Sequence, residues 1–115
     1  MQKYDLAEKY YKKAIDSEPR NFGEKFYKSS IMCNLGILYE KNCKDELAEK
    51  YYKMGIEYNN NSKSMVQLGK FYQMKKQYDL ALKYYQMGAG EGHPLAKHLL
   101  KELKKSDLLS KTDII

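Results

Sequence analysis

The residues of this chain that could do chemistry are two cysteines, two histidines and one glycine-rich segment. Cys33 and Cys43 stand ten positions apart, without the Cys-x-x-Cys spacing of zinc sites and redox pairs. His93 and His98 lie five apart with no third ligand in the pattern, which favours surface positions over a metal site. The segment 88–92 is rich in glycine, but no strand is predicted before it and no Gly-Lys-Ser/Thr follows, so it indicates a turn that ends a helix. We therefore expect reduced thiols, no metal, no cofactor and no enzymatic activity.

The composition is that of a folded chain with an excess of positive charge. With 115 residues, 43% of them hydrophobic and 31% charged, the chain is predicted to form one domain. No run approaches the roughly 20 apolar residues that cross a bilayer, and the first residues do not resemble a signal peptide, so we expect an intracellular, cytoplasmic protein without membrane association. The net charge of +6 favours acidic partners, but the lysines are spread along the chain and select no ligand by themselves.

The tyrosines reveal internal repeats. The chain has twelve tyrosines and no tryptophan, and three tyrosine doublets stand at 10–11, 51–52 and 84–85, each preceded by a Leu-Ala pair. The second doublet follows the first by 41 residues and the third follows the second by 33. A different unit, 32–39, returns after 33 residues as 65–72. One repeat therefore contains two helices, an A helix followed by a B helix that carries the tyrosine doublet.

Each unit has the apolar spacing of an α-helix. The A unit carries its apolar stripe at i, i+3, i+4 and i+7, at Met32, Leu35, Gly36 and Tyr39. Glycine in the middle of a helix costs about 1 kcal/mol relative to alanine. Its repetition at Gly36 and Gly69 therefore indicates that two helices cross closely there. The connections 41–44 and 75–77 are short and polar, which predicts antiparallel hairpins.

These residues resemble the tetratricopeptide signature, in which W-x-x-L-G-x-x-Y precedes A-x-x-x-F and a proline. The matching positions are Met32, Leu35, Gly36, Tyr39, Ala48 and Tyr52, and again Met65, Leu68, Gly69, Tyr72, Ala81 and Tyr85. Asn60 stands at the proline position, which only Pro19 of the first unit keeps, and the segment 85–94 resembles the Sel1-like branch of the family. The resemblance implies an all-α fold, an α-α superhelix built as an antiparallel helix-hairpin solenoid with a C-terminal capping helix.

The repeats predict how the chain is divided. We expect a repeat domain over residues 1–105 and a tail over 106–115. The domain is expected to contain helix B of an incomplete first repeat in 1–20, a second repeat in 22–60, a third in 61–92 and a capping helix in 93–105. The longer first spacing predicts a second A helix over 24–40, with Phe26 on the face of Cys33. In the capping helix, Leu100 is expected at the position of the A-helix glycine.

The first repeat lacks its A helix. The face that this helix would cover, with Leu6, Tyr10 and Ala14, is therefore expected to be partly open. Either the chain is a piece of a longer protein or another molecule docks there, and a homodimer through this face is one arrangement that would cover it.

The resemblance also implies a function, since the A helices of this family line a concave groove that binds peptides. The candidate groove residues are Cys33, Asn34, Ile37, Glu40, Lys63, Val66, Gln67, Lys70 and Gln73. Their mixture of amides, lysines and apolar groups suits a protein or peptide partner with acidic or carboxylate character. Asn34 and Lys63 match two positions of the carboxylate clamp of tetratricopeptide co-chaperones, but Gln67 stands where that clamp has arginine, so a complete clamp is not expected.

An alternative function uses the B helices. Their basic, tyrosine-rich face could stack the bases of single-stranded RNA or support structural self-assembly. However, Tyr11, Tyr52 and Tyr85 occupy the core aromatic position of the signature, which favours packing over base stacking. We therefore predict a non-enzymatic protein-interaction module and regard a nucleic-acid partner as the less favoured hypothesis.

Overall fold

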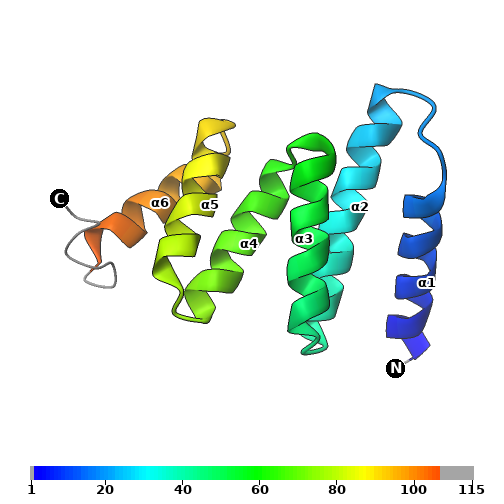
Figure 1. The fold of residues 1–115 in the computed structure, drawn as a ribbon, viewed down its shortest axis with the longest axis horizontal. Helices are drawn as coiled ribbons and strands as arrows, with labels where there is room; N and C mark the ends of the chain where they lie inside the picture. Colours follow the sequence, from blue (N-terminus) through cyan, green and yellow to red (C-terminus); the bar gives the residue numbers. More distant parts are fainter. Residues whose placement is uncertain (1, 107–115) are drawn as a thin grey trace. The chain divides into compact units, whose positions relative to one another are not determined.

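The computed structural model describes residues 2–106, with side chains from Tyr4 onward, and over that range it contains six α-helices and no strand (Figure 1). The helices are α1 (Gln2–Asp16), α2 (Phe22–Lys41), α3 (Asp45–Asn59), α4 (Ser62–Met74), α5 (Tyr78–Gly90) and α6 (Pro94–Lys105). The all-α prediction is confirmed. The predicted tail lies outside the described residues, apart from Ser106. None of the described helices is both long and apolar enough to span a membrane.

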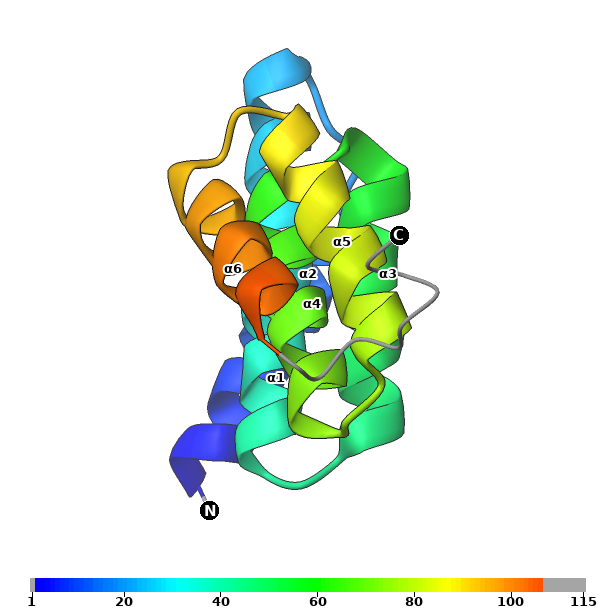
Figure 2. The ribbon, with the colours of Figure 1, turned by 90° about the vertical axis from the view of Figure 1, so that its left-hand side faces the viewer.

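The chain divides into two compact units, Met1–Ser64 and Met65–Ile115, where the sequence predicts a single repeat domain. In the first unit α1 packs on α2, and α2 packs on α3 as an antiparallel pair (Figure 1). In the second unit α5 and α6 lie side by side in both views of the molecule (Figures 1 and 2). Consecutive helices therefore pack against each other within each unit.

The long helix α2 begins with a side-chain cap. The Asn21 side chain accepts a hydrogen bond of 2.9 Å from the backbone N–H of Glu24, which satisfies one of the donors left open at a helix start. The Glu24 carboxylate in turn lies 3.2 Å from the Arg20 guanidinium. As a result, α2 runs from Phe22 to Lys41 and includes the whole of the predicted range 24–40.

The turns inside the two hairpins have the same geometry. Cys43 and Lys76, 33 residues apart, both have a positive φ, of 59° and 63°. In each turn the following residue donates its backbone N–H over 2.9 Å to the carbonyl of the A-helix tyrosine, Lys44 to Tyr39 and Gln77 to Tyr72. The repetition seen in the sequence therefore extends to the backbone of the turns.

Asparagine at position 60 has a conformational reason. Asn60 ends α3 in the left-handed region, with a φ of 47°, and its N–H donates to the carbonyl of Ile56 over 2.8 Å. Proline is locked near a φ of −65° and has no N–H, so it could form neither feature. Asparagine is one of the few residues with a side chain that commonly adopt this conformation.

The core of the first unit forms where α2 and α3 cross. Gly36 lies so close to the ring of Tyr52 that a Cβ atom on this glycine would stand 2.6 Å from the ring carbons. Tyr52 and Ala48 are fully buried at this crossing. The close approach predicted from the mid-helix glycine is confirmed, and the second unit repeats it with Gly69 and the buried Tyr85 at 2.5 Å.

The register of α6 differs from the prediction by one residue. A Cβ atom on Gly88 would meet the Cβ atom of Ala96 at 2.8 Å, just as one on Gly55 would meet the Ser64 hydroxyl at 2.6 Å. Ala96 is therefore equivalent to Ser64, and counting onward places Lys101, not Leu100, at the position of the A-helix glycine. The predicted place of Leu100 was wrong because a stripe of leucines can be aligned with an A helix in more than one register.

Candidate functional site

Two of the predicted groove residues are buried. We call α2 and α4 A-type helices, and α1, α3 and α5 B-type helices. Cys33 is 0% exposed and interacts with Ser64 at the start of α4, and burial raises the pKa of its thiol. Val66 is 1% exposed, and its methyl group would lie 3.6 Å from a Cβ atom on Gly88. The prediction that Cys33 and Val66 line an accessible groove was therefore wrong, because that part of each A-type helix packs against a neighbouring helix.

Two further groove candidates close the hairpins. The Tyr52 hydroxyl donates to Glu40 over 2.7 Å, and the Tyr85 hydroxyl donates to Gln73 over the same distance. Glu40 and Gln73 are half-buried, and each follows a mid-helix glycine by four residues. Burial and the neighbouring Glu40 carboxylate raise the pKa of Tyr52, and burial raises the pKa of Tyr85 to about 12. Both acceptors thus hold a core tyrosine.

Asn34 and Lys63 lie together in the first unit. The exposed Lys63 ammonium donates to the Asn34 side-chain oxygen over 3.1 Å. The first turn of α4 that carries Lys63 is anchored by the buried Asn61, whose side chain accepts from the Ser64 N–H at 2.8 Å and donates to the Ser29 hydroxyl at 3.1 Å. The first turn of α4 is therefore held in place, and it positions the Lys63 ammonium beside the Asn34 amide.

Ile37 belongs to the same face. With Asn34 it lines a shallow hollow between α1 and α2, together with Tyr11, Leu38 and Lys41. Tyr11 and Lys41 were missed from the sequence as members of this site. Tyr11 could have been found from its repeat position, because it is equivalent to Tyr52 and Tyr85 but has no A-helix unit before it in the repeat pattern. The hollow therefore combines apolar and aromatic side chains with the Asn34 amide and with Lys41, a second lysine in addition to Lys63.

In the second unit, the remaining candidates lie on α4. Lys70 is exposed and Gln67 is half-buried. Both side chains are therefore at least partly accessible.

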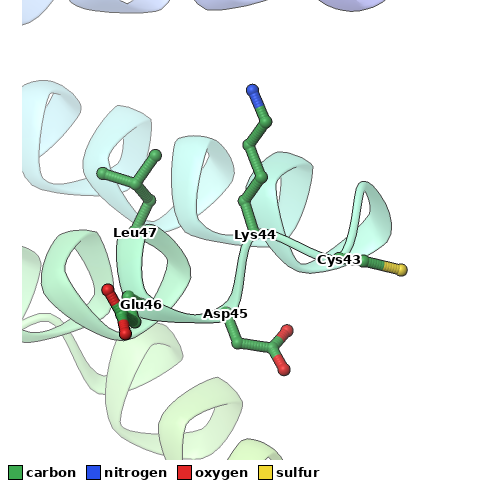
Figure 3. Close-up of a pocket in the computed structure, with 5 residues that line it drawn as sticks. All are labelled: Cys43, Lys44, Asp45, Glu46 and Leu47. Carbon is green, nitrogen blue, oxygen red and sulfur yellow. The ribbon is translucent and has the colours of Figure 1, made fainter.

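A second hollow lies at the turn between α2 and α3, lined by residues 43–47 (Figure 3). Lys44 extends to one side of this turn and Asp45 to the other (Figure 3). The Lys44 ammonium stands 5.0 Å from the centre of the Tyr4 ring, so this lysine helps to hold α1. Over the described range, no three or more His, Cys, Asp or Glu side chains are grouped so that they could hold a metal ion.

Leu6 and Tyr10 of α1 are more exposed than Leu80 and Tyr84, the equivalent residues of α5. Leu6 is 52% exposed and Tyr10 is 62% exposed, and Ala14 is half-buried. The prediction of a partly open face is confirmed. The opposite side of α1 is held to α2, where the Tyr39 hydroxyl donates to Glu8 and thereby lowers the pKa of that carboxyl group.

A second group of exposed apolar side chains stands at the start of α2. Phe22, Phe26 and Tyr27 are 77%, 58% and 64% exposed. Phe26 continues the face of Cys33 by two helical turns, as predicted, but it lies beyond the buried part of that face. These aromatics extend the accessible surface of the first unit.

No protein-family model matches the chain, and no curated protein matches it at a significant level. What the chain does must therefore be inferred from its repeats and from the accessible faces described above.

Proposed function

We propose that this chain is a non-enzymatic protein-interaction module of the tetratricopeptide or Sel1-like type. In this proposal an acidic peptide binds to the accessible A-type face of α2, at Asn34, Ile37 and Lys63. The observation that carries the proposal is the 3.1 Å bond between the Lys63 ammonium and the Asn34 amide, beside the hollow that Ile37 lines.

The chemistry of this cluster supports a carboxylate ligand. A lysine ammonium has three donors, and the bond to Asn34 uses one of them. Its acceptor is a neutral amide, so a peptide carboxylate that reached Lys63 would form a stronger, charge-assisted bond. The Asn34 amide has N–H donors of its own, and Lys41 brings a second positive charge to the hollow. An apolar side chain next to the carboxylate could rest on Ile37.

The packing of the tyrosines supports this function over RNA binding. Tyr51 lies against Tyr39 with 5.5 Å between ring centres, and Tyr84 stacks on Tyr72 at 5.7 Å. The following tyrosine of each doublet is buried. The doublets of α3 and α5 are therefore used largely inside their hairpins, and base stacking would have to compete with these contacts. RNA binding or structural self-assembly through the B-type face stays the alternative hypothesis.

The test is a peptide titration with two charge reversals. The probe is a fluorescent decapeptide of alternating Glu and Leu with a free C-terminal carboxylate, followed by fluorescence anisotropy. We expect Lys63→Glu to weaken binding about tenfold or more, since it removes a charge-assisted bond and adds repulsion. Lys50→Glu makes the same change of charge on α3 and should leave the affinity unchanged.

Equal losses with both variants would contradict the proposal, because they would reflect net charge alone. The alternative predicts the opposite pattern: single-stranded RNA would bind, Lys50→Glu would weaken it, and the affinity would fall steeply with salt.

A further inference from the structure

Four lysines share one face of α6, which we call the lysine face. They follow the spacing i, i+4, i+7 and i+8, which places them within one arc of an α-helix, and they are Lys97, Lys101, Lys104 and Lys105. At 1.5 Å per residue the row is about 12 Å long. All four side chains are exposed, and none of them takes part in an ion pair between described residues.

The same face of α4 is the one that packs against α5. The equivalence of Ala96 and Ser64 gives each lysine a counterpart in α4, and these counterparts are Met65, Gly69, Tyr72 and Gln73. Met65 and Tyr72 are buried, and Gly69 receives the ring of Tyr85. The hairpin face of an A-type helix is therefore replaced in α6 by a row of lysines.

Lysines at these positions keep the face in water. A lysine is almost never fully buried without a partner for its charge, so no helix can pack over four of them as α5 packs over α4. This holds whatever residues follow α6 in the chain. The opposite side of α6 is held in place, since Ala96 and Leu103 are buried and α6 lies beside α5 (Figure 2). The lysine face is thus a solvent-side surface on a fixed helix.

The charge around the lysine face has one sign. The described part of the second unit, residues 65–106, has eight lysines and three acidic residues, whereas residues 1–64 have twelve basic and ten acidic residues. Glu102 is the one acidic residue of α6, and it lies outside the arc of the lysines. The positive charge of this unit is therefore largely uncompensated, which favours an anionic partner.

We propose that the lysine face of α6 binds the phosphate backbone of a nucleic acid without reading its sequence. A row of ammonium groups matches a chain of closely spaced phosphates, because each lysine that neutralises a phosphate releases a condensed counterion. The face has no aromatic side chain for base stacking and no amide to read base edges, so its contacts are with phosphates. This site is separate from the tyrosine-rich face of the B-type helices.

Two other anionic partners fit the lysine face less well. An acidic helix would need an apolar seam to pack on α6, and this face offers it only exposed ion pairs, each of which adds little. A helix that binds a membrane surface inserts its apolar side among the lipids, but that side of α6 is packed on α5. A nucleic acid backbone requires neither an apolar seam nor a free apolar side.

The test measures how the affinity for a duplex depends on salt. The probe is a fluorescein-labelled DNA duplex of about 20 base pairs, and its binding to the 115-residue chain is followed by anisotropy. Four phosphate contacts predict a slope of about −3.6 in log K against log salt, so the affinity should fall about 150-fold between about 50 and 200 mM salt. Replacing two lysines, with Lys97→Gln and Lys101→Gln, should halve the slope and leave a fall of about 12-fold.

The matched control removes the same charge elsewhere. Lys9→Gln with Lys13→Gln changes two exposed lysines that also stand one helical turn apart, on α1. This pair should leave the slope unchanged. The pair Lys97→Gln and Lys101→Gln should bind the Glu-Leu decapeptide as the parent chain does, so the failure of this proposal is distinct from that of the peptide site on α2. Circular dichroism checks that both variants keep the fold.

Four results would overturn the proposal. The first is a duplex that does not bind at about 50 mM salt, and the second is an equal loss of slope in both pairs, since net charge alone would then explain the binding. The third is binding of single-stranded RNA but not of the duplex, because the bases would then be the ligand. The fourth is binding to vesicles that contain phosphatidylserine but not to the duplex, because lipid headgroups would then be the partner.

Discussion

Replacing Gly36 by alanine tests how closely α2 and α3 cross, because a close contact reverses the sign of the expected change in stability. In an ordinary helix interior this change stabilises by about 1 kcal/mol. Here the new methyl group would stand 2.6 Å from the Tyr52 ring and 3.2 Å from the Ala48 carbonyl oxygen. Because Tyr52 is 0% exposed, its ring cannot swing into solvent. We therefore expect Gly36→Ala to destabilise.

The size follows from three contributions. Overpacking a core typically costs about 1–3 kcal/mol. Displacing the ring also weakens the 2.7 Å bond from the Tyr52 hydroxyl to Glu40, and bonds to charged groups contribute about 1.5–3 kcal/mol. Against these stands the gain of about 1 kcal/mol in helix propensity. If part of the bond is lost, the net cost is about 2 kcal/mol, which lowers the melting temperature by about 8 °C.

Urea unfolding followed by circular dichroism measures this loss. Gly90→Ala is the matched control, since Gly90 ends α5 and a Cβ atom there would meet no atom within 4 Å. It is expected to leave stability unchanged or raise it by up to about 1 kcal/mol. In a Tyr52→Leu background, Gly36→Ala should cost much less. A stabilising Gly36→Ala would refute the reasoning, because it would mean that the two helices do not cross closely at this residue.

Three further predictions concern the turns, a cap and the core tyrosines. Cys43→Gly and Lys76→Gly are each expected to stabilise by about 1 kcal/mol in urea unfolding, because residues with a side chain are strained at positive φ; a loss of stability would contradict this. Asn61→Ala is expected to cost about 2 kcal/mol, since the side chain caps α4 and satisfies a buried hydroxyl; thermal unfolding measures it, and a change below about 0.5 kcal/mol would count against these bonds. Burial raises the pKa of Tyr52 and brings that of Tyr85 to about 12, so the folded state keeps both protonated where the unfolded chain ionises near pH 10. The stability they contribute is therefore complete below about pH 10 and is lost as the pH rises toward 12. Phenolate absorbance should rise together with the loss of helical circular dichroism, and Tyr85→Phe should reduce that step; ionisation of both residues in the intact fold would contradict the account.

Much of the local structure could be predicted because it depends on local patterns. The stripe around Gly36 and the tyrosine doublets predicted the helices and the hairpins, and the longer first spacing predicted the extension of α2. Apolar spacing is repeated within a few turns, so it can be detected without knowing what each helix contacts. The register of α6 could not be found in this way. It depends on the contact of Gly88 with Ala96, which only the packed helices reveal.

The candidate site was harder to predict because one face of an A-type helix meets different neighbours along its length. Cys33 and Asn34 are adjacent in sequence, yet Cys33 is buried and Asn34 stays accessible. The helical spacing placed both residues on the lining of the predicted groove. It could not show that the start of α4 would cover Cys33. Glu40 shows a second limit, since its repeat position is shared with Gln73 but its bond to a buried hydroxyl is visible only in the structure.

The proposed function places an acidic peptide on the accessible A-type face of α2. The most direct measurement is an NMR titration of the 115-residue chain with the Glu-Leu decapeptide, followed through the amide chemical shifts. We expect changes concentrated at Asn34, Ile37 and Lys63, because the Lys63 ammonium donates to the Asn34 side chain over 3.1 Å and Ile37 lines the neighbouring hollow. Changes concentrated on α3, around Lys50, would contradict the proposed site, as would a spectrum that the peptide leaves unchanged.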